Sequence, residues 1–440
     1  MTQLQIPQRF PLDNAAQIFV NIVSKGETTL SRIGLVMSEP VDRERLQQAI
    51  TNIIPVRFPY FQVYLKKTFF AYVLERTDDI PQVEDDSFYT NRHVDFHDEN
   101  FLYRFRTGGN NIALEMSHIL SDGYGTLVLL LSVTAEYFRL EGIEIEDFPL
   151  IFTPGDSIDP REWGCAYAEV FSSEGPSMKA EKQAYIPEGK AIPFERYYTA
   201  QFQMDLEKTR KSARERKVTL VVLISGIYLW AIQQIYLEDL KAGKAKAGLP
   251  LRFQIPINLR RDYPTRSLKN FSYIFSPSFT LKRPEDEKDL EEIIRIISED
   301  IRYERHNHTV ENQVRRNLRL TENPLYKYMP RVIKERFLAF FYQIFARGLF
   351  SGVLTSLGEM KLPPALEKRV EAIDILACNS PAPGRNSTMF SYKGILEVNI
   401  GSTVDNLRLE EKIAGKLNEL ELEFKLQNKR ASPDDIPLGD

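Results

Sequence analysis

The sequence predicts an α/β fold, and three observations support that prediction. Helical and strand patterns alternate along the whole chain. Each half carries strands, then a long helix, then further strands, as expected when helices cover sheets. The chain has 440 residues, of which 43% are apolar and 11% aromatic, so it can fill two or three domain-sized cores.

Charge and cysteine content exclude several classes of protein. The 57 basic and 61 acidic residues give a net charge of −4, which argues against general nucleic-acid binding. Cys165 and Cys378 are too few for a disulfide framework and fit a reducing compartment. The N-terminus lacks signal-peptide features, and the most apolar run, Leu220 to Ile232, is shorter than the ~20 residues of a bilayer span. We therefore expect a cytoplasmic protein without a membrane span.

The first elements follow from simple periodicities. Residues 32–37 alternate like a strand, and we expect Asp42 to be the N-cap of the helix that follows. That helix carries one apolar stripe from Leu46 to Ile54, and we expect Pro55 and Pro59 to end it. Residues 61–65 and 69–74 predict two strands joined by a hairpin turn at Lys66-Lys67.

The most informative strand covers residues 111–118, where Ile112, Leu114, Met116 and His118 share one face. Residues 121–125 are turn formers, and a helix is expected over about 126–139. His118 therefore lies where a rigid strand meets a loop, which is a common position for catalytic and binding residues.

The remaining periodicities predict the domain organisation. Periodicity fades over 151–193, so we expect an N-terminal domain at 1–175, a crossover linker at 176–195 and a C-terminal domain at 196–440. In the second domain we expect strands at 196–205, 252–257, 271–281, 372–378, 387–392 and 395–400, helices at 208–238 (broken near 217–219), 290–301 and 412–426, and a loose polar tail at 428–440.

His118 to Gly123 form a His-x-x-x-Asp-Gly motif. Imidazole is the side chain best suited to take a proton near neutral pH. Asp122 can hold the local fold, and Gly123 permits a backbone angle that other residues resist. A structural histidine that caps the strand is the alternative interpretation, and the motif alone does not decide between the two.

With its surroundings, the motif resembles the CoA-dependent acyltransferase superfamily, and most closely its bacterial alcohol-acetyltransferase-like branch. Most of the chain takes part in the resemblance. The matching pieces, in order, are Arg57 to Phe61, His118 to Gly123, Val218 to Trp230, Pro256 to Arg261 with Ser267 to Phe271, and Thr355-Ser356-Leu357-Gly358, a variant of the family's Ser-Asn-x-Gly stretch.

The resemblance implies two chloramphenicol-acetyltransferase-like α/β sandwich domains that form a pseudo-dimer around a central tunnel. His118 would act there as the general base on an acceptor hydroxyl, which attacks a thioester directly. Asp122 would be structural and pair with Arg260, or failing that with Arg261. The backbone N–H of Gly123 and the side chain of Asn270 are the candidate oxyanion donors.

The implied function is an acyltransferase that moves an acyl group, plausibly acetyl, from acyl-CoA to a small alcohol. We expect a monomer with acyl-CoA as co-substrate, no permanently bound cofactor and no metal. Two alternatives stay open: carrier-protein-dependent condensation in natural-product biosynthesis, and a non-catalytic ligand-binding protein on the same scaffold. Ser117 stands where condensation domains usually have a further histidine, which disfavours amide formation.

Other clusters suggest weaker hypotheses. His93 and His97 could suggest a metal, but strand and loop spacing does not place both rings on one side. His306 and His308 lie in a polar stretch that is typical of a solvated surface. We interpret both cysteines as small core residues. A solvated face is favoured over a clamp on CoA phosphates for the basic cluster Arg315, Arg316, Arg319, Lys327, Arg331 and Lys334.

Overall fold

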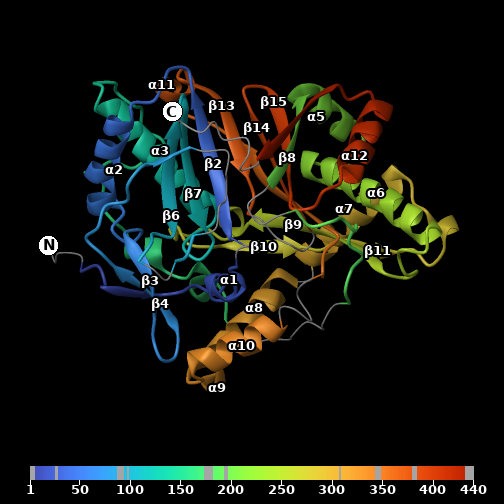
Figure 1. The fold of residues 1–440 in the computed structure, drawn as a ribbon, viewed down its shortest axis with the longest axis horizontal. Coiled ribbons are helices and arrows are strands. Elements are labelled where there is room, and N and C mark those ends of the chain that lie inside the picture. Colours follow the sequence, from blue (N-terminus) through green and yellow to red (C-terminus); the bar gives the residue numbers. More distant parts are fainter. Residues whose placement is uncertain are drawn as a thin grey trace.

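The computed structural model describes residues 5–24, 28–86, 94–96, 99–172, 182–192, 197–306, 309–341, 348–378 and 384–431. They form a mixed α/β fold with two lobes, shown side by side in Figure 1. This confirms the predicted fold class.

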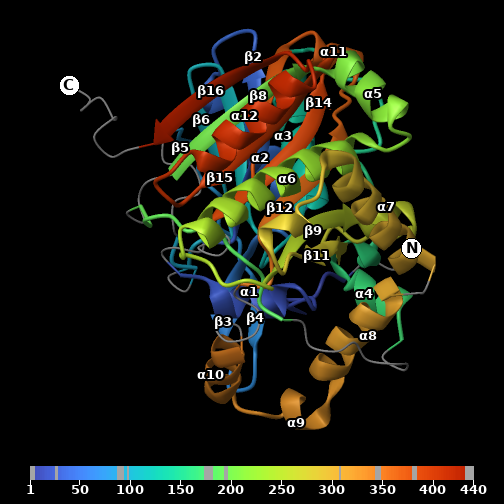
Figure 2. The ribbon, with the colours of Figure 1, turned by 90° about the vertical axis from the view of Figure 1, so that its right-hand side faces the viewer.

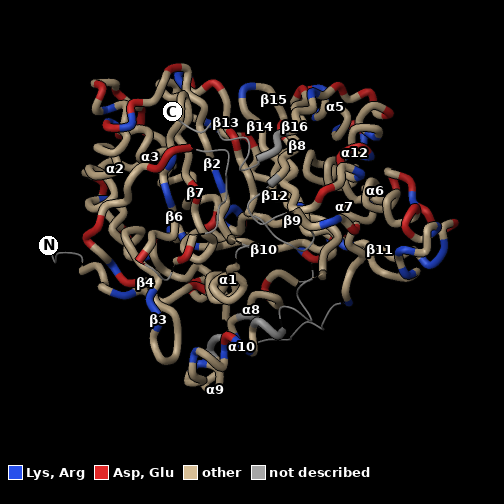
Figure 3. The backbone as a smooth tube through the Cα atoms, viewed as in Figure 1, with Lys and Arg blue, Asp and Glu red and all other residues tan. Residues whose placement is uncertain are grey.

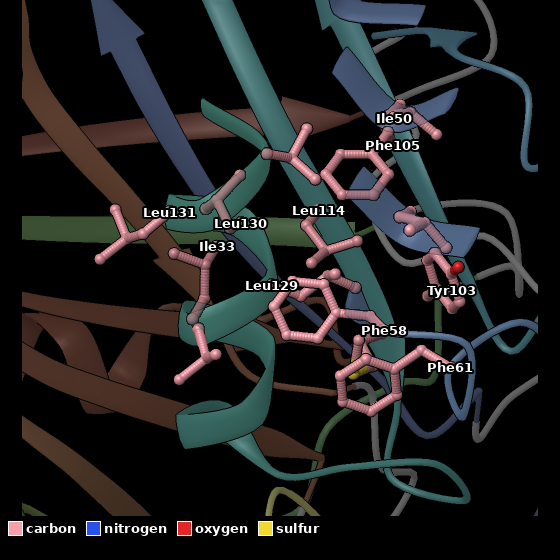
Figure 4. Packing of buried hydrophobic residues seen from close by; sticks show 14 of the residues in the cluster. Ile33, Ile50, Phe58, Phe61, Tyr103, Phe105, Leu114, Leu129, Leu130 and Leu131 are labelled. Atoms are coloured by element: carbon pink, nitrogen blue, oxygen red, sulfur yellow. The ribbon is translucent and has the colours of Figure 1, made fainter. Parts of the chain in front are cut away.

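The first lobe is built on a sheet with the strand order β13-β2-β7-β6-β5. The helices α2 (Arg43–Arg57) and α3 (Gly123–Arg139) pack against each other on one side of it (Figure 1). Figure 4 shows their buried side chains meeting those of the sheet, including Ile50, Leu129 and Leu114. The strands are β13 (Val370–Leu376), β2 (Leu30–Met37), β7 (Asn111–Ser117), β6 (Tyr103–Gly108) and β5 (Glu84–Asp85).

The second lobe is built on a longer sheet with the order β10-β9-β12-β14-β15-β8-β16, with β11 (Ser278–Thr280) paired to β9. Its strands are β10 (Ser272–Phe275), β9 (Pro250–Asn258), β12 (Gly352–Glu359), β14 (Arg385–Tyr392), β15 (Ile395–Ser402), β8 (Tyr197–Asp205) and β16 (Phe424–Ala431). Its helices are α5 (Leu206–Glu215), α6 (Leu220–Lys241), α7 (Leu290–His306) and α12 (Arg408–Glu419).

Smaller elements lie around the two lobes. A small sheet has the order β1-β4-β3, from β1 (Arg9–Pro11), β4 (Tyr72–Arg76) and β3 (Val63–Lys67). The helices α8 (Thr309–Glu322), α9 (Pro324–Lys327) and α10 (Arg331–Phe341) form an arm that projects from the rest of the molecule (Figure 2). The short helices are α1 (Ala16–Ile22), α4 (Ala166–Val170) and α11 (Pro364–Glu367), with 3₁₀ turns at Pro160–Trp163, Leu259–Arg261 and Pro284–Asp286.

The lobes are not sequential along the chain. Strand β13 comes late in the sequence, yet it pairs antiparallel with β2 in the first lobe, with Ile373 opposite Leu35. The strands before and after it, β12 and β14, pair with each other in the second lobe. The domain division at 1–175 and 196–440 stays a prediction, and the backbone pairing of β13 crosses it.

Several predicted boundaries were wrong for physical reasons. Pro55 lies inside α2, because the helix loses only one backbone donor there and the Phe58 N–H still reaches the Ile54 carbonyl at 3.0 Å. The turn of the β3–β4 hairpin lies at 68–71 instead of at Lys66-Lys67. The Thr68 N–H donates a hydrogen bond to the Ala71 carbonyl there. Helix α3 begins at Gly123, since Asp122 caps it.

The C-terminal prediction was also wrong. Helix α12 ends at Glu419, and Glu421 takes a left-handed backbone angle of 55° that stops it. The strand β16 then pairs along β8, so residues 424–426 are strand instead of the predicted helix, and residues 428–431 of the predicted tail 428–440 are strand as well. The rest of that tail, 432–440, lies outside the described residues. Residues 271–281 form the two strands β10 and β11 instead of one.

Within the described residues, α6 alone is long and apolar enough to cross a membrane. Its most apolar window is 78% buried in the second lobe, which is typical of a core helix.

Candidate active site

His118 lies just after β7, and local contacts fix its position. Its backbone N–H donates to the Thr29 carbonyl at 3.0 Å, so the chain leaves the sheet beside the start of β2. Its ring stacks on Phe19 of α1, with centroids 5.0 Å apart and planes 22° from parallel. The residue is half-buried, which leaves part of it open to solvent.

Asn270 fixes which ring nitrogen of His118 carries the proton. The Asn270 amide nitrogen lies 2.9 Å from Asp13 Oδ2 and 2.8 Å from the His118 carbonyl, both of which are acceptors. The amide oxygen must therefore face His118 Nδ1, 3.2 Å away, and it can only accept. Nδ1 then carries the hydrogen, and Nε2 keeps its lone pair.

Burial keeps this imidazole neutral. Loss of solvation lowers the pKa of His118 below its usual value and outweighs the opposing effects of Asn270, Asp122 and Asp13. A neutral imidazole whose Nε2 carries no hydrogen is the form that a general base requires.

Asp13 is the site residue that sequence reasoning missed. It is 2% exposed and accepts from the backbone N–H groups of Ala16 and Asn270 as well as from the Asn270 side chain. Burial raises its pKa, while the nearby Lys269 opposes that rise. The Asp13 carboxylate accepts a hydrogen bond from the Asn270 amide nitrogen and so polarises the amide. This strengthens the amide oxygen as an acceptor for His118. No motif flags Asp13, because it lies 257 residues from Asn270 in sequence.

Both carboxylate oxygens of Asp122 accept hydrogen bonds that hold the local structure. Its Oδ1 accepts from the N–H groups of Tyr124 and Gly125 and so caps α3. Its Oδ2 accepts from Arg260 Nη1 at 2.7 Å and from the Phe271 N–H at 2.9 Å. The predicted Arg260 pairing is therefore confirmed, and the pair ties the start of α3 to the second half of the chain.

Arg260 is held in turn by backbone oxygens. Its Nε donates to the Ser267 carbonyl at 3.1 Å, Nη2 donates to the Lys269 carbonyl, and the guanidinium lies 4.5 Å from the centre of the Tyr124 ring. Arg260 therefore shapes the 267–270 segment that presents Asn270 to His118.

The glycine that the loop needs is Gly125, not Gly123. A Cβ on Gly125 would lie 2.1 Å from Ser121 Oγ and 2.3 Å from the Leu268 carbonyl, which leaves no room for it. Gly123 has no left-handed backbone angle, and a Cβ there would meet only Leu357 at 3.7 Å. The prediction that Gly123 supplies an unusual backbone angle was wrong.

The other matching pieces support this arrangement. Arg57 is fully buried and makes a two-pronged ion pair with Glu162 at 2.7 and 2.9 Å. The Glu162 carbonyl accepts from the Leu268 N–H, next to Asn270. The contact between Leu357 and the Gly123 position brings the variant Thr355 to Gly358 stretch of β12 beside the start of α3.

The weaker candidates fall into three groups. His93, His97 and His308 lie outside the described residues, and His306 is exposed at the end of α7. Cys165 and Cys378 form no disulfide, and both are half-buried. Arg331 and Lys334 are not on a solvated face as predicted, because they donate to the carbonyls of Thr68 and Phe70.

No protein-family model and no curated protein matches the sequence. Solved structures do match in fold. The wax ester synthase/diacylglycerol acyltransferase from Marinobacter aquaeolei VT8 aligns with a TM-score of 0.54 and 15% identity over 93% of this chain and 98% of its own. TRI101 from F. sporotrichioides, solved with coenzyme A and T-2, aligns with a TM-score of 0.60 and 11% identity over 96% of this chain and 99% of its own. The epimerization domain from the third module of tyrocidine synthetase B aligns with a TM-score of 0.59 and 11% identity over 95% of this chain and 97% of its own.

Proposed function

We propose that this chain, which has the fold shared by CoA-dependent acyltransferases and condensation domains, is an O-acyltransferase that uses His118 as its general base. The observation that carries the proposal is the Asn270 contact, which holds the proton on Nδ1 and leaves Nε2 as a base.

The proposed reaction needs no covalent enzyme intermediate. Nε2 of His118 removes the proton of an acceptor hydroxyl while its oxygen attacks the thioester carbonyl. The C–O bond forms, the tetrahedral oxyanion collapses with cleavage of the C–S bond, and the imidazolium returns the proton to the departing thiolate. The products are an ester and a free thiol.

The oxyanion needs a hydrogen-bond donor. Both N–H bonds of the Asn270 amide point to Asp13 and to the His118 carbonyl, so that side chain is committed elsewhere. This leaves the backbone N–H of Gly123, in the first turn of α3, as the candidate donor.

The proposed donor is an acyl-CoA such as acetyl-CoA, and the proposed acceptor is a small alcohol. One structure of the same fold was solved with coenzyme A, which supports a CoA thioester. Similarity to a peptide synthetase domain favours the second candidate, a carrier-bound acyl donor. We propose a cytoplasmic enzyme that works as a monomer, in a tunnel between the lobes.

The test measures thiol release from acetyl-CoA with a panel of small alcohols. We expect His118→Ala to lower turnover about 10²–10⁴-fold, the range of general-base catalysis. His306→Ala is the matched control, because this exposed histidine lies at the end of α7, and it should keep full activity. Wild-type turnover by His118→Ala would exclude the base. Activity with an acyl carrier protein but not with the CoA thioester would select the second candidate.

A further inference from the structure

Exposed apolar side chains gather at one end of the molecule. Of the twelve large hydrophobic residues that are exposed in the described part of the chain, seven lie on the tip of the β3–β4 hairpin and on the segment from α9 to α10. We call them the arm–hairpin surface, and their exposed fractions run from 43% to 82%. They are Phe69, Phe70, Leu325, Tyr328, Val332, Ile333 and Phe337.

The hairpin and the arm are held together, so the two parts of the surface are fixed relative to each other. The Arg331 N–H donates to the Phe69 carbonyl at 2.9 Å, and Lys334 Nζ donates to the Phe70 carbonyl at 2.8 Å. The rings of Phe70 and Tyr328 meet edge to face at 6.4 Å. Figures 1 and 2 both show α10 beside this hairpin, at the end of the molecule from which the arm projects.

Over residues 331–337, α10 turns polar side chains toward the hairpin and apolar side chains toward solvent. The polar residues Arg331, Lys334 and Glu335 contact the hairpin. Its apolar residues Val332, Ile333 and Phe337 face solvent instead. Because soluble proteins seldom expose contiguous apolar patches of this kind, this face is expected to meet an apolar partner.

The charge around the surface is strongly positive. Residues 66–71 and 323–341 contain six basic residues and one acidic residue, Glu335. With Glu99, the ion-pair partner of Lys66, the local charge is +4, whereas the whole chain carries −4. Lys67, Lys327 and Arg336 are exposed beside the apolar side chains. In Figure 3 the blue segments of the hairpin and of α10 mark this charge.

We propose that the arm–hairpin surface docks the protein on an anionic lipid bilayer. Phe69, Phe70 and the apolar face of α10 would enter the boundary between headgroups and acyl chains, and the flanking lysines and arginine would contact lipid phosphates. The surface projects outward, and a deformable bilayer accommodates such a shape without a complementary groove. The inference stands on the arm–hairpin surface alone, and it adds peripheral attachment to the acyl transfer proposed above.

Vesicle flotation tests it. The full-length protein should bind vesicles with 30% phosphatidylglycerol in phosphatidylcholine at least ~10-fold better than pure phosphatidylcholine, and added salt should weaken binding. The paired substitution Lys67→Gln and Arg336→Gln should weaken binding to the anionic vesicles about 25-fold, at ~1 kcal/mol per charge. Phe69→Ser with Phe70→Ser should reduce it by a similar factor or more.

Matched controls separate docking from general stickiness. Ile395→Ser and Val56→Ser remove exposed apolar side chains outside the surface and should bind as the wild type does. A tryptophan at position 69 (Phe69→Trp) should shift its emission to the blue with anionic vesicles, whereas Val56→Trp should not. Unchanged circular dichroism shows that the variants fold.

Three results would overturn the proposal. They are failure of the wild type to bind anionic vesicles, equal binding by the arm–hairpin variants, and a dimer or an acyl-carrier-protein complex that these substitutions disrupt while vesicles are not bound.

Discussion

At the scale of single residues, the proposed chemistry depends on one amide side chain. Asn270 is a positioning residue, because it acts on the acceptor through His118. Asn270→Ala should lower kcat/KM by about 10–100-fold, since the ring would lose the contact that holds its tautomer and orientation. The assay is the thiol-release measurement with acetyl-CoA.

The pH profile distinguishes this role from a structural one. Burial lowers the pKa of His118, so wild-type kcat/KM should stay on its plateau below about pH 6.5 and fall only as acid protonates the ring. The Asn270 contact raises that pKa, so Asn270→Ala should move the acid limb to still lower pH. An unmoved acid limb would contradict the role proposed for Asn270.

The two glycines of the loop make a matched pair. Gly125→Ala places a Cβ 2.1 Å from Ser121 Oγ and 2.3 Å from the Leu268 carbonyl, so backbone must move. We expect it to lower the free energy of unfolding by about 3 kcal/mol in urea titrations. Gly123→Ala meets only Leu357, at 3.7 Å, and should change stability by less than about 1 kcal/mol. Equal effects of the two substitutions would show that the loop packs differently.

His118, Asp122 and Arg260 could be predicted because each belongs to a short local pattern. Asp13 could not be predicted, because it takes part only through the folding of the segment before α1 onto residues 267–270. The chosen glycine was wrong for a related reason. Crowding at Gly125 comes from Leu268, a distant residue that no local pattern reports.

At the scale of elements, the first sheet contains a buried charge network. Glu115 of β7 is fully buried, and it pairs with Arg104 and Arg106 of β6 at 2.5 and 2.9 Å and with Arg32 of β2 at 3.6 Å. Burial alone would raise the pKa of Glu115, but the three guanidiniums outweigh it and lower that pKa. The network therefore links three adjacent strands by charge as well as by backbone pairing.

This network predicts an acid-dependent stability. Because the folded pKa of Glu115 is lowered, its contribution is complete above its unfolded value of about 4.3 and is lost as pH falls through the folded value. Glu115→Gln should cost about 3–5 kcal/mol at pH 7 and flatten the acid dependence of the free energy of unfolding. Glu75→Gln, which breaks the exposed pair with Arg9, should cost less than about 1 kcal/mol. Similar losses for both variants would contradict the importance of the buried network.

Element type was more predictable than element ends. The apolar stripe of α7 and the alternation of β7 fixed both types correctly. The chain after α12 was misjudged because its helical pattern runs into Phe424 and Leu426, which alternate along a strand. These residues form a strand because their backbone pairs with β8, which lies more than two hundred residues earlier in the chain.

At the scale of the whole molecule, the described residues join the lobes both at the candidate site and through the sheets. The Asp122–Arg260 pair and the Asn270 contacts join them at the site. Strand β13 joins them at the sheets, since it leaves β12 in the second lobe, pairs with β2 in the first, and returns to β14. Local periodicity predicted a strand here but not its partner, because pairing depends on where the chain folds back.

We call β13 the exchanged strand, because it belongs to the sheet of the first lobe while the strands before and after it belong to the second. This arrangement predicts that both lobes unfold together. Ile373 of β13 is 3% exposed within the core of the first lobe, so Ile373→Asp buries a charge there and removes apolar contacts. The variant should lose more than about 3 kcal/mol, with a single transition by near- and far-ultraviolet circular dichroism. Leu229→Ala, in the core of the second lobe, should shift the same single transition by about 2–5 kcal/mol. Two separated transitions, with only one shifted by each substitution, would show that the lobes are independent despite the exchanged strand.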